Sequence, residues 1–166
     1  NGRTLGSILQ DPEHGKFFWD LRSDFDALWH LYGIKLEGIV DIQLLENYSR
    51  EGSSKELLLG LAKAVDSVVP LSDVEKLRWT STKQTLKRQM GSTDVFANRP
   101  LDDATLRYCV NDVVHLPYLH QHYFQQCQQG WRYPVEVSRA TVERAIHAAS
   151  ADNVPGPHLQ LGPWGA

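Results

Sequence analysis

The sequence predicts an α/β domain dominated by helix, with two short strands and about six helices. The apolar run at residues 16–19 indicates one buried strand, and residues 38–40 are the second strand candidate. Apolar residues at helical spacing cover most of the remainder. Two short strands make a marginal sheet on their own, and an apolar strand is normally covered on both faces of a larger sheet. The chain therefore looks like the helix-rich half of an α/β domain.

Composition indicates an ordinary globular protein. The chain has 166 residues, of which 42% are hydrophobic and 22% are charged, and this suits one folded domain with a sizeable core. Its 17 basic and 20 acidic residues give a net charge of −3, which excludes a protein that binds nucleic acid through bulk positive charge alone. The charge balance still allows a local basic patch.

The sequence also predicts an intracellular protein, nuclear or cytoplasmic. Cys109 and Cys127 are too few and too far apart for a disulfide framework or a zinc site. No apolar run approaches the ~20 residues of a membrane span, and no signal peptide opens the chain. Because the first residue is Asn1 rather than methionine, we expect a fragment of a longer protein.

In the first third of the chain, helices alternate with strands. The helices are expected at residues 4–9, 24–32 and 41–49, and the strands at residues 16–19 and 38–40. Ser23 is the expected N-cap of the second helix, with Asp26 completing a capping box, and Gly33 is expected to end that helix. Asp41 is placed to cap the helix that directly follows the second strand.

The rest of the chain is expected to be mainly helical. Ser72 is the expected N-cap of a helix, with Glu75 as its capping-box partner. In the last helix, Val137, Val142 and Ile146 are the expected inward positions. The helices are expected at residues 55–65, from residue 72, at residues 100–130 and at residues 134–150. Residues 152–166 contain three prolines and three glycines and are expected to form an irregular tail.

Residues 76–99 stand out by their charge, because the segment contains six basic residues and only one acidic residue, Asp94. The basic residues are Lys76, Arg78, Lys83, Lys87, Arg88 and Arg99. The segment is either a solvated helix and loop or a phosphate-facing patch, in which Lys83, Lys87 and Arg88 would contact nucleic acid. Charge alone favours the solvated face.

Carboxylates are the best candidates for chemistry, because the sequence has no Gly-rich phosphate loop and no HExxH, CxxC or GxSxG motif. Asp20, Asp24 and Asp26 cluster where the first strand meets the second helix. Each has an ordinary structural explanation: Asp20 can make a turn, Asp24 can complement the helix dipole, and Asp26 can complete a capping box.

Tyr108 and Asp112 form the second candidate pair, because residues four apart share one face of a helix. Asp112 is flanked by valines, and a carboxylate is costly to bury there unless it is paired or binds a cation. Asp24 and Asp112 could converge on one divalent ion. Their oxygen ligands suit Mg²⁺ or Mn²⁺ rather than zinc, and such sites can activate water for phosphodiester cleavage.

Two segments resemble ribonuclease-D-like 3′–5′ exonucleases, members of the DEDD class with a ribonuclease-H-like fold. FFWDLRSDFDALWHLYGIKLEGIVDIQLLENYSR, at residues 17–50, is similar to the second motif region of this family. RPLDDATLRYCVNDVVHLPYLHQHY, at residues 99–123, is similar to the third. With KELLLGLAKAV and LGPW included, the chain is similar to the exonuclease-domain proteins common in fungi. The resemblance implies that residues 1–129 are the C-terminal part of an exonuclease domain and residues 130–151 a C-terminal helix.

The resemblance also implies roles for particular residues. Asp24 and Asp112 match metal ligands of the second and third motifs, and Tyr108 matches the tyrosine that orients or deprotonates the attacking water. Arg107 stands where the histidine subclass has its histidine, which indicates the tyrosine subclass. In the family, two Mg²⁺ or Mn²⁺ ions act at the 3′ end of single-stranded RNA or DNA and release a nucleoside 5′-monophosphate. Asp20 and Asp41 are implied to be supporting or structural groups.

The chain departs from the family at the first motif, Asp-x-Glu on an apolar strand. Only Asp11 and Glu13 match it by letter, and they follow a helix and flank a proline. We therefore expect a truncated fold with an incomplete two-metal site, and a chain that is poorly active or inactive. The alternatives are a catalytically inactive nucleic-acid-binding module and a protein-interaction module. An exposed sheet edge would also favour self-association.

Overall fold

The computed structural model describes residues 2–52, 54–90, 95–127, 134–150, 153 and 156–165, apart from the side chains of residues 83–90. The chain divides into two compact units. The first unit comprises Asn1–Leu59 with His120–Ala166, and the second comprises Gly60–Leu119. In the described ranges, none of the helices combines the length and the apolar composition needed to cross a membrane.

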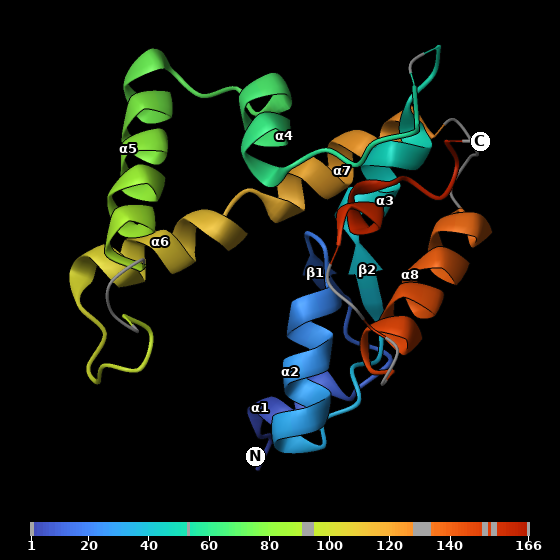
Figure 1. Cartoon of the computed structure of the whole chain (residues 1–166), viewed down its shortest axis with the longest axis horizontal. Coiled ribbons are helices and arrows are strands. Elements are labelled where there is room, and N and C mark those ends of the chain that lie inside the picture. Colours follow the sequence, from blue (N-terminus) through green and yellow to red (C-terminus); the bar gives the residue numbers. More distant parts are fainter. Residues whose placement is uncertain are drawn as a thin grey trace. The chain divides into compact units, whose positions relative to one another are not determined.

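The first unit is built on a two-stranded parallel sheet. Strands β1 (Lys16–Phe18) and β2 (Ile39–Asp41) pair with Phe17 opposite Val40. The helices associated with this sheet are α1 (Leu5–Leu9), α2 (Arg22–Tyr32), α3 (Ile42–Ser49) and α8 (Val135–Ala148). Helix α8 packs against α2, α3 and β2 (Figure 1). The α/β fold class predicted from the sequence, with two short strands, is confirmed.

The second unit contains helices α4 (Leu61–Val68), α5 (Asp73–Met90) and α6 (Asp103–Val113). Helix α5 begins as predicted, because the Ser72 hydroxyl donates to Glu75 Oε2 at 2.6 Å and the Glu75 carboxylate accepts the Ser72 N–H at 2.8 Å. Helix α5 packs against α6, and Trp79 on α5 is buried. Helix α7 (Leu116–Gln126) follows, and its residues from His120 belong to the first unit.

The predicted start of α2 is wrong by two residues. The helix begins at Arg22, and Leu21 occupies the N-cap without a side-chain hydrogen bond, so Ser23 does not cap it. Instead, the N–H of Leu21 donates to the Asp41 carboxylate at 3.3 Å. A distant residue therefore satisfies this helix end, and a local capping motif is not needed. The predicted end is confirmed, since Gly33 is left-handed with φ 63°.

The predicted helix at residues 55–65 starts only at Leu61, because the preceding residues pair with the C-terminal segment. Leu57 and Leu161 form an antiparallel bridge, and the N–H of Leu58 donates to the carbonyl of Gln160 at 2.8 Å. The C-terminal segment, expected to be irregular, contains the 3₁₀ helix η1 (Pro157–Gln160). The predicted boundary at residues 129–130 lies outside the described residues, as do residues 151–152, 154–155 and 166.

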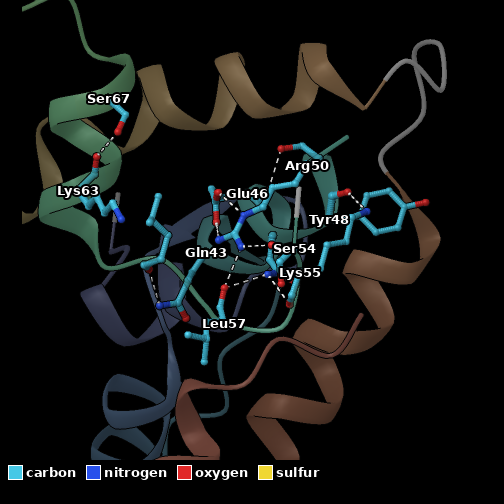
Figure 2. Close-up of polar contacts among 12 residues, drawn as sticks. Gln43, Glu46, Tyr48, Arg50, Ser54, Lys55, Leu57, Lys63 and Ser67 are labelled. Carbon is cyan, nitrogen blue, oxygen red and sulfur yellow. Dashed lines mark hydrogen bonds and ion pairs between the residues drawn. The ribbon is translucent and has the colours of Figure 1, made fainter. Parts of the chain in front are cut away.

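An ion pair fixes the loop that follows α3. Arg50 donates to both carboxylate oxygens of Glu46, at 2.8 and 2.7 Å, and Glu46 is buried. The same guanidinium donates to the carbonyls of Ser54 and Leu57 at 2.8 Å each (Figure 2). Arg50 therefore holds the end of α3 to the residues that pair with the C-terminal segment.

The predicted long helix at residues 100–130 is two helices, α6 and α7, with a break at residues 114–115. Pro117 explains the break, because proline lacks an N–H and its ring clashes with the carbonyl four residues earlier. In α8, Val137 is buried as predicted, but Val142 and Ile146 are exposed. The buried face of α8 instead uses smaller side chains, those of Thr141, Ala145 and Ala148.

Gly38→Ala is expected to destabilise the protein more than Gly33→Ala. Both glycines are left-handed, with φ 59° and 63°, so alanine at either position costs about 1–2 kcal/mol. A Cβ at Gly38 would also lie 2.6 Å from the carbonyl oxygen of His14, whereas a Cβ at Gly33 meets nothing within 4 Å. Urea unfolding of the two variants measures the difference, and equal losses would contradict this account of Gly38.

Candidate functional site

Asp24 lies in the first turn of α2, directly after the β1–α2 junction. Its side chain is exposed. The pKa of its carboxyl is nevertheless raised, first because neighbouring protein atoms displace water, and then because the negative charges of Asp20 and Asp41 disfavour ionisation. A carboxylate in this environment would gain from a bound cation.

Asp20 shapes the junction before α2. It is the described non-glycine residue with a positive φ, 64°, a conformation that aspartate tolerates better than most residues. Arg22 donates to both carboxylate oxygens of Asp20 at 2.6 Å, which is bidentate geometry. Arg22 also donates to the carbonyl of Leu159 at 2.8 Å, so the C-terminal segment contacts this junction.

Asp41 joins the ends of both strands. Its side chain is fully buried and accepts hydrogen bonds from the backbone N–H groups of Asp20 at 3.2 Å, Leu21 at 3.3 Å and Gln43 at 3.0 Å. The bond from Gln43 confirms that Asp41 caps α3. Arg144 on α8 donates to the Asp41 carboxylate at 2.8 Å. Asp41 is therefore a structural group of the junction.

Tyr108 and Asp112 interact on α6. Both side chains are half-buried. The pKa of Tyr108 is raised, mainly by burial, and also by the charge of Asp112 and by a hydrogen bond to its carboxylate. The apolar surroundings expected for Asp112 are not formed by the flanking valines, because Val110 and Val113 are exposed. The hydrogen bond between the two side chains confirms that the spacing of four residues places Tyr108 beside Asp112.

The predicted metal ligands belong to different units, Asp24 to the first and Asp112 to the second. Among the described residues, no group of three or more histidine, cysteine or acidic side chains is placed to hold a metal ion. Carboxylate oxygens suit Mg²⁺ or Mn²⁺, and the raised pKa of Asp24 fits a cation ligand. Asp11 and Glu13, which match Asp-x-Glu by letter, lie between α1 and β1, and the N–H of Glu13 donates to Asp11 Oδ1 at 2.9 Å.

The expected basic contacts Lys83, Lys87 and Arg88 lie on α5, but their side chains are outside the described part of the chain. A pocket of about 420 Å³ lies between α5 and α6, in the second unit. Arg78, Trp79, Arg107 and His115 are among the residues that line it. Its two arginines come from separate segments of the sequence.

Two arginines have contacts that the sequence did not indicate. Arg107 lines the pocket in the second unit, and Arg144 contacts Asp41 in the first unit. Arg144 lies 103 residues after its partner Asp41, so local patterns carry no signal for the pair. One feature could have suggested a buried counter-ion: arginine occupies a buried position of an amphipathic helix, and a buried arginine is normally paired.

Asp24→Asn is expected to give a small rise in the melting temperature of the metal-free protein at pH 7. Because the pKa of Asp24 is raised on folding, its contribution to stability is greatest below its ordinary value of 3.8 and is lost as the pH rises through the folded value. The rise should therefore shrink as the pH is lowered and vanish below 3.8. Thermal melts of this variant and of Asp26→Asn, which removes a carboxylate 3.5 Å from His30, test this. A lower melting temperature for Asp24→Asn at pH 7 would contradict it.

Comparisons with known proteins place the chain in a family. A family model of 3′–5′ exonucleases matches residues 2–126. Crystal structures of Trypanosoma brucei RNase D in complex with GMP, alone, and in complex with RNA U12 match with TM-scores of 0.70, 0.69 and 0.68 and identities of 26%, 26% and 27%.

Each of these matches covers 93% of this chain and 45%, 51% and 49%, respectively, of the RNase D chains, so the chain spans about half of their length. A comparison with curated proteins found no match. The family model covers most of the chain, including both predicted motif regions, and the α/β fold matches that of RNase D. The chain belongs to the 3′–5′ exonuclease family of the DEDD class.

Proposed function

We propose that this chain hydrolyses phosphodiester bonds at the 3′ end of single-stranded nucleic acid, with Asp24 and Asp112 as metal ligands. The observation that carries the proposal is the pairing of Tyr108 with Asp112 on one face of α6, inside the segment matched by the exonuclease family model. The RNase D structures with RNA U12 and with GMP support a nucleic-acid substrate and a nucleotide product. The substrate is RNA or DNA.

The proposed roles differ between the two carboxylates and Tyr108. Asp24 and Asp112 would hold Mg²⁺ or Mn²⁺, which supply activation of water and stabilisation of the leaving oxygen when bound. Tyr108 would orient the attacking water or take its proton, and burial together with the neighbouring Asp112 carboxylate raises the pKa of its phenol. Arg107, five residues before Asp112, supports membership of the tyrosine subclass. The similarity to fungal proteins remains a prediction.

We further propose that the chain cleaves slowly. Asp24 and Asp112 supply two carboxylates where the family uses four, and the other acidic groups beside Asp24 are engaged. Asp20 is bound by Arg22, and Asp41 is bound by Arg144. Two carboxylates hold a divalent ion weakly, so a high Mn²⁺ concentration should be needed for activity.

A nucleic-acid-binding module without catalysis is the second candidate. The pocket between α5 and α6 favours it, because Arg78 and Arg107 line it and can contact phosphates, and the buried Trp79 also lines it. Contacts from Lys83, Lys87 and Arg88 to nucleic acid remain proposals, as does self-association at the edge of the two-stranded sheet. Binding that weakens with salt and is not accompanied by Mn²⁺-dependent cleavage would favour this candidate.

The test is the degradation of 5′-labelled single-stranded RNA and DNA oligonucleotides with Mn²⁺. We expect a ladder that shortens from the 3′ end, and Tyr108→Phe should lower kcat by about 10²–10⁴-fold, the usual loss when a proton-handling group is removed. KM should change little, because the hydroxyl acts on the water. Cleavage at internal positions, or no cleavage by the unmodified chain, would contradict the proposal.

A further inference from the structure

Arg144 is a nearly buried cation on α8, with 10% of its side chain exposed. Its Nη1 atom donates to Asp41 Oδ2 at 2.8 Å and to Gln43 Oε1 at 2.9 Å, and it lies 3.7 Å from Asp20 Oδ1. One nitrogen therefore contacts three side chains that belong to the β1–α2 junction and the β2–α3 junction. These contacts lie within the first unit.

Asp41 connects Arg144 to the backbone before α2. Its carboxylate accepts the N–H groups of Asp20 and Leu21, which are the last two residues before α2. The first of them is the left-handed Asp20, a conformation that persists only when its surroundings hold it. Asp24 follows in the first turn of α2. The direction in which α2 leaves the sheet thus depends on where the Asp41 carboxylate is held.

Other contacts on Asp41 and Gln43 cannot replace Arg144. The amide nitrogen of Gln43 donates to the carbonyl of Leu59 at 2.9 Å, which fixes its amide but not the carboxylate of Asp41. Arg22 is bound to Asp20 and to the carbonyl of Leu159. Among the described residues, Arg144 is the cation paired with Asp41.

We propose that Arg144 is a positioning residue for Asp24: it fixes the Asp41 carboxylate, which fixes the backbone of residues 20–21 and so the placement of the Asp24 side chain. This inference rests on the proposed function, in which Asp24 is a metal ligand. Helix α8 lies outside the segment matched by the family model, at residues 2–126, so it would contribute to the site from beyond that segment.

The test compares Arg144→Met, Arg144→Lys and the control Val137→Ala. Val137 is a fully buried residue of the same helix, so its truncation lowers stability without touching Asp41. Hydrogen exchange of the Asp20 and Leu21 amides measures the hydrogen bonds to Asp41 directly. Mn²⁺ binding, followed by electron paramagnetic resonance with and without Asp24→Asn, measures the placement of Asp24. Both are measured well below the melting temperatures.

In Arg144→Met, we expect exchange of the two amides to accelerate at least about tenfold more than in Val137→Ala. The Asp24-dependent Mn²⁺ affinity should fall about 10–100-fold, as when an outer-shell partner is removed. Arg144→Lys should restore part of both, because one ammonium can replace the single Nη1 that makes these contacts. Unchanged exchange in Arg144→Met, or equal effects in Val137→Ala, would overturn the inference. Mn²⁺ binding that Asp24→Asn leaves unchanged would instead contradict the proposed function, and the exchange rates would still decide the role of Arg144.

Discussion

Asp41→Ala is expected to lower the free energy of unfolding by about 3–5 kcal/mol, the usual loss when one partner of a buried ion pair is removed. Asp41 is fully buried, and its removal leaves Arg144, itself 10% exposed, without the carboxylate that lies 2.8 Å away. The N–H groups of Asp20 and Leu21 lose their acceptor as well. Burying these unpaired groups costs more than the ion pair itself contributes.

Urea unfolding at pH 7 measures this loss, with Asp26→Ala as the control. Asp26 is a carboxylate of α2 with 48% of its side chain exposed, and its removal should change stability by no more than about 0.5 kcal/mol. The double variant Asp41→Leu with Arg144→Met should recover part of the loss, because no charge is then buried without a partner, while the N–H groups of Asp20 and Leu21 still lack their acceptor. A loss below about 1 kcal/mol in Asp41→Ala would show that the junction does not depend on this pair.

Asp112→Asn is expected to slow Mn²⁺-dependent cleavage by at least about 100-fold, beyond the usual cost of losing an outer-shell group of a metal site. Asparagine keeps the size of the side chain but removes its negative charge, so metal affinity falls while the helix is preserved. Tyr108 should also titrate at a lower pH, because the carboxylate of Asp112 contributes to its raised pKa. The unfolding free energy should change little.

Asp103→Asn is the matched control, because Asp103 is an exposed residue in the first turn of the same helix. Its cleavage rate should equal that of the unmodified chain. If Asp112→Asn and Asp103→Asn cleave equally fast, Asp112 is not a metal ligand. If both are slow, the loss comes from a change in α6 as a whole.

Local signals in the sequence predicted the elements whose ends are satisfied locally. Ser72 and Glu75 form the expected capping box, and Gly33 takes the left-handed conformation that ends α2. Pro117 was a visible signal for the break between α6 and α7, and the periodicity of apolar residues across it concealed that break. The missing N–H and the ring of Pro117 therefore override the helical periodicity of the apolar residues around it.

Long-range contacts account for the errors. Residues 55–60 have the apolar spacing of a helix, but Leu57 pairs with Leu161 across the length of the chain. The helical spacing of apolar residues also predicted the wrong inner face for α8. Close packing there favours the small Ala145, which is buried, over Ile146, which is exposed. In both cases the structure depends on the segment of the chain that packs against these residues, and not on their local pattern.

In the candidate site, too, local contacts could be predicted from the sequence and long-range contacts could not. Tyr108 and Asp112 are one helical turn apart, so their contact followed from spacing alone. The surroundings of Asp24 could not be predicted, because they depend on Asp41, which lies on another strand, and on Arg144, which lies on a distant helix. The sequence therefore indicated the candidate ligands but not the contacts of Asp41 and Arg144 at the junction before α2.

The proposed function requires that Asp24 and Asp112 both act in the cleavage reaction. Its most direct test is the rate of Mn²⁺-dependent shortening of a 5′-labelled oligonucleotide by the unmodified chain, Asp24→Asn, Asp112→Asn and the double variant. If both carboxylates act on the same bond cleavage, each single variant should lose at least about 100-fold and the double variant should be no slower than the slower single variant. Full activity of Asp24→Asn, or losses that multiply in the double variant, would contradict the proposal that both carboxylates act in the same cleavage reaction.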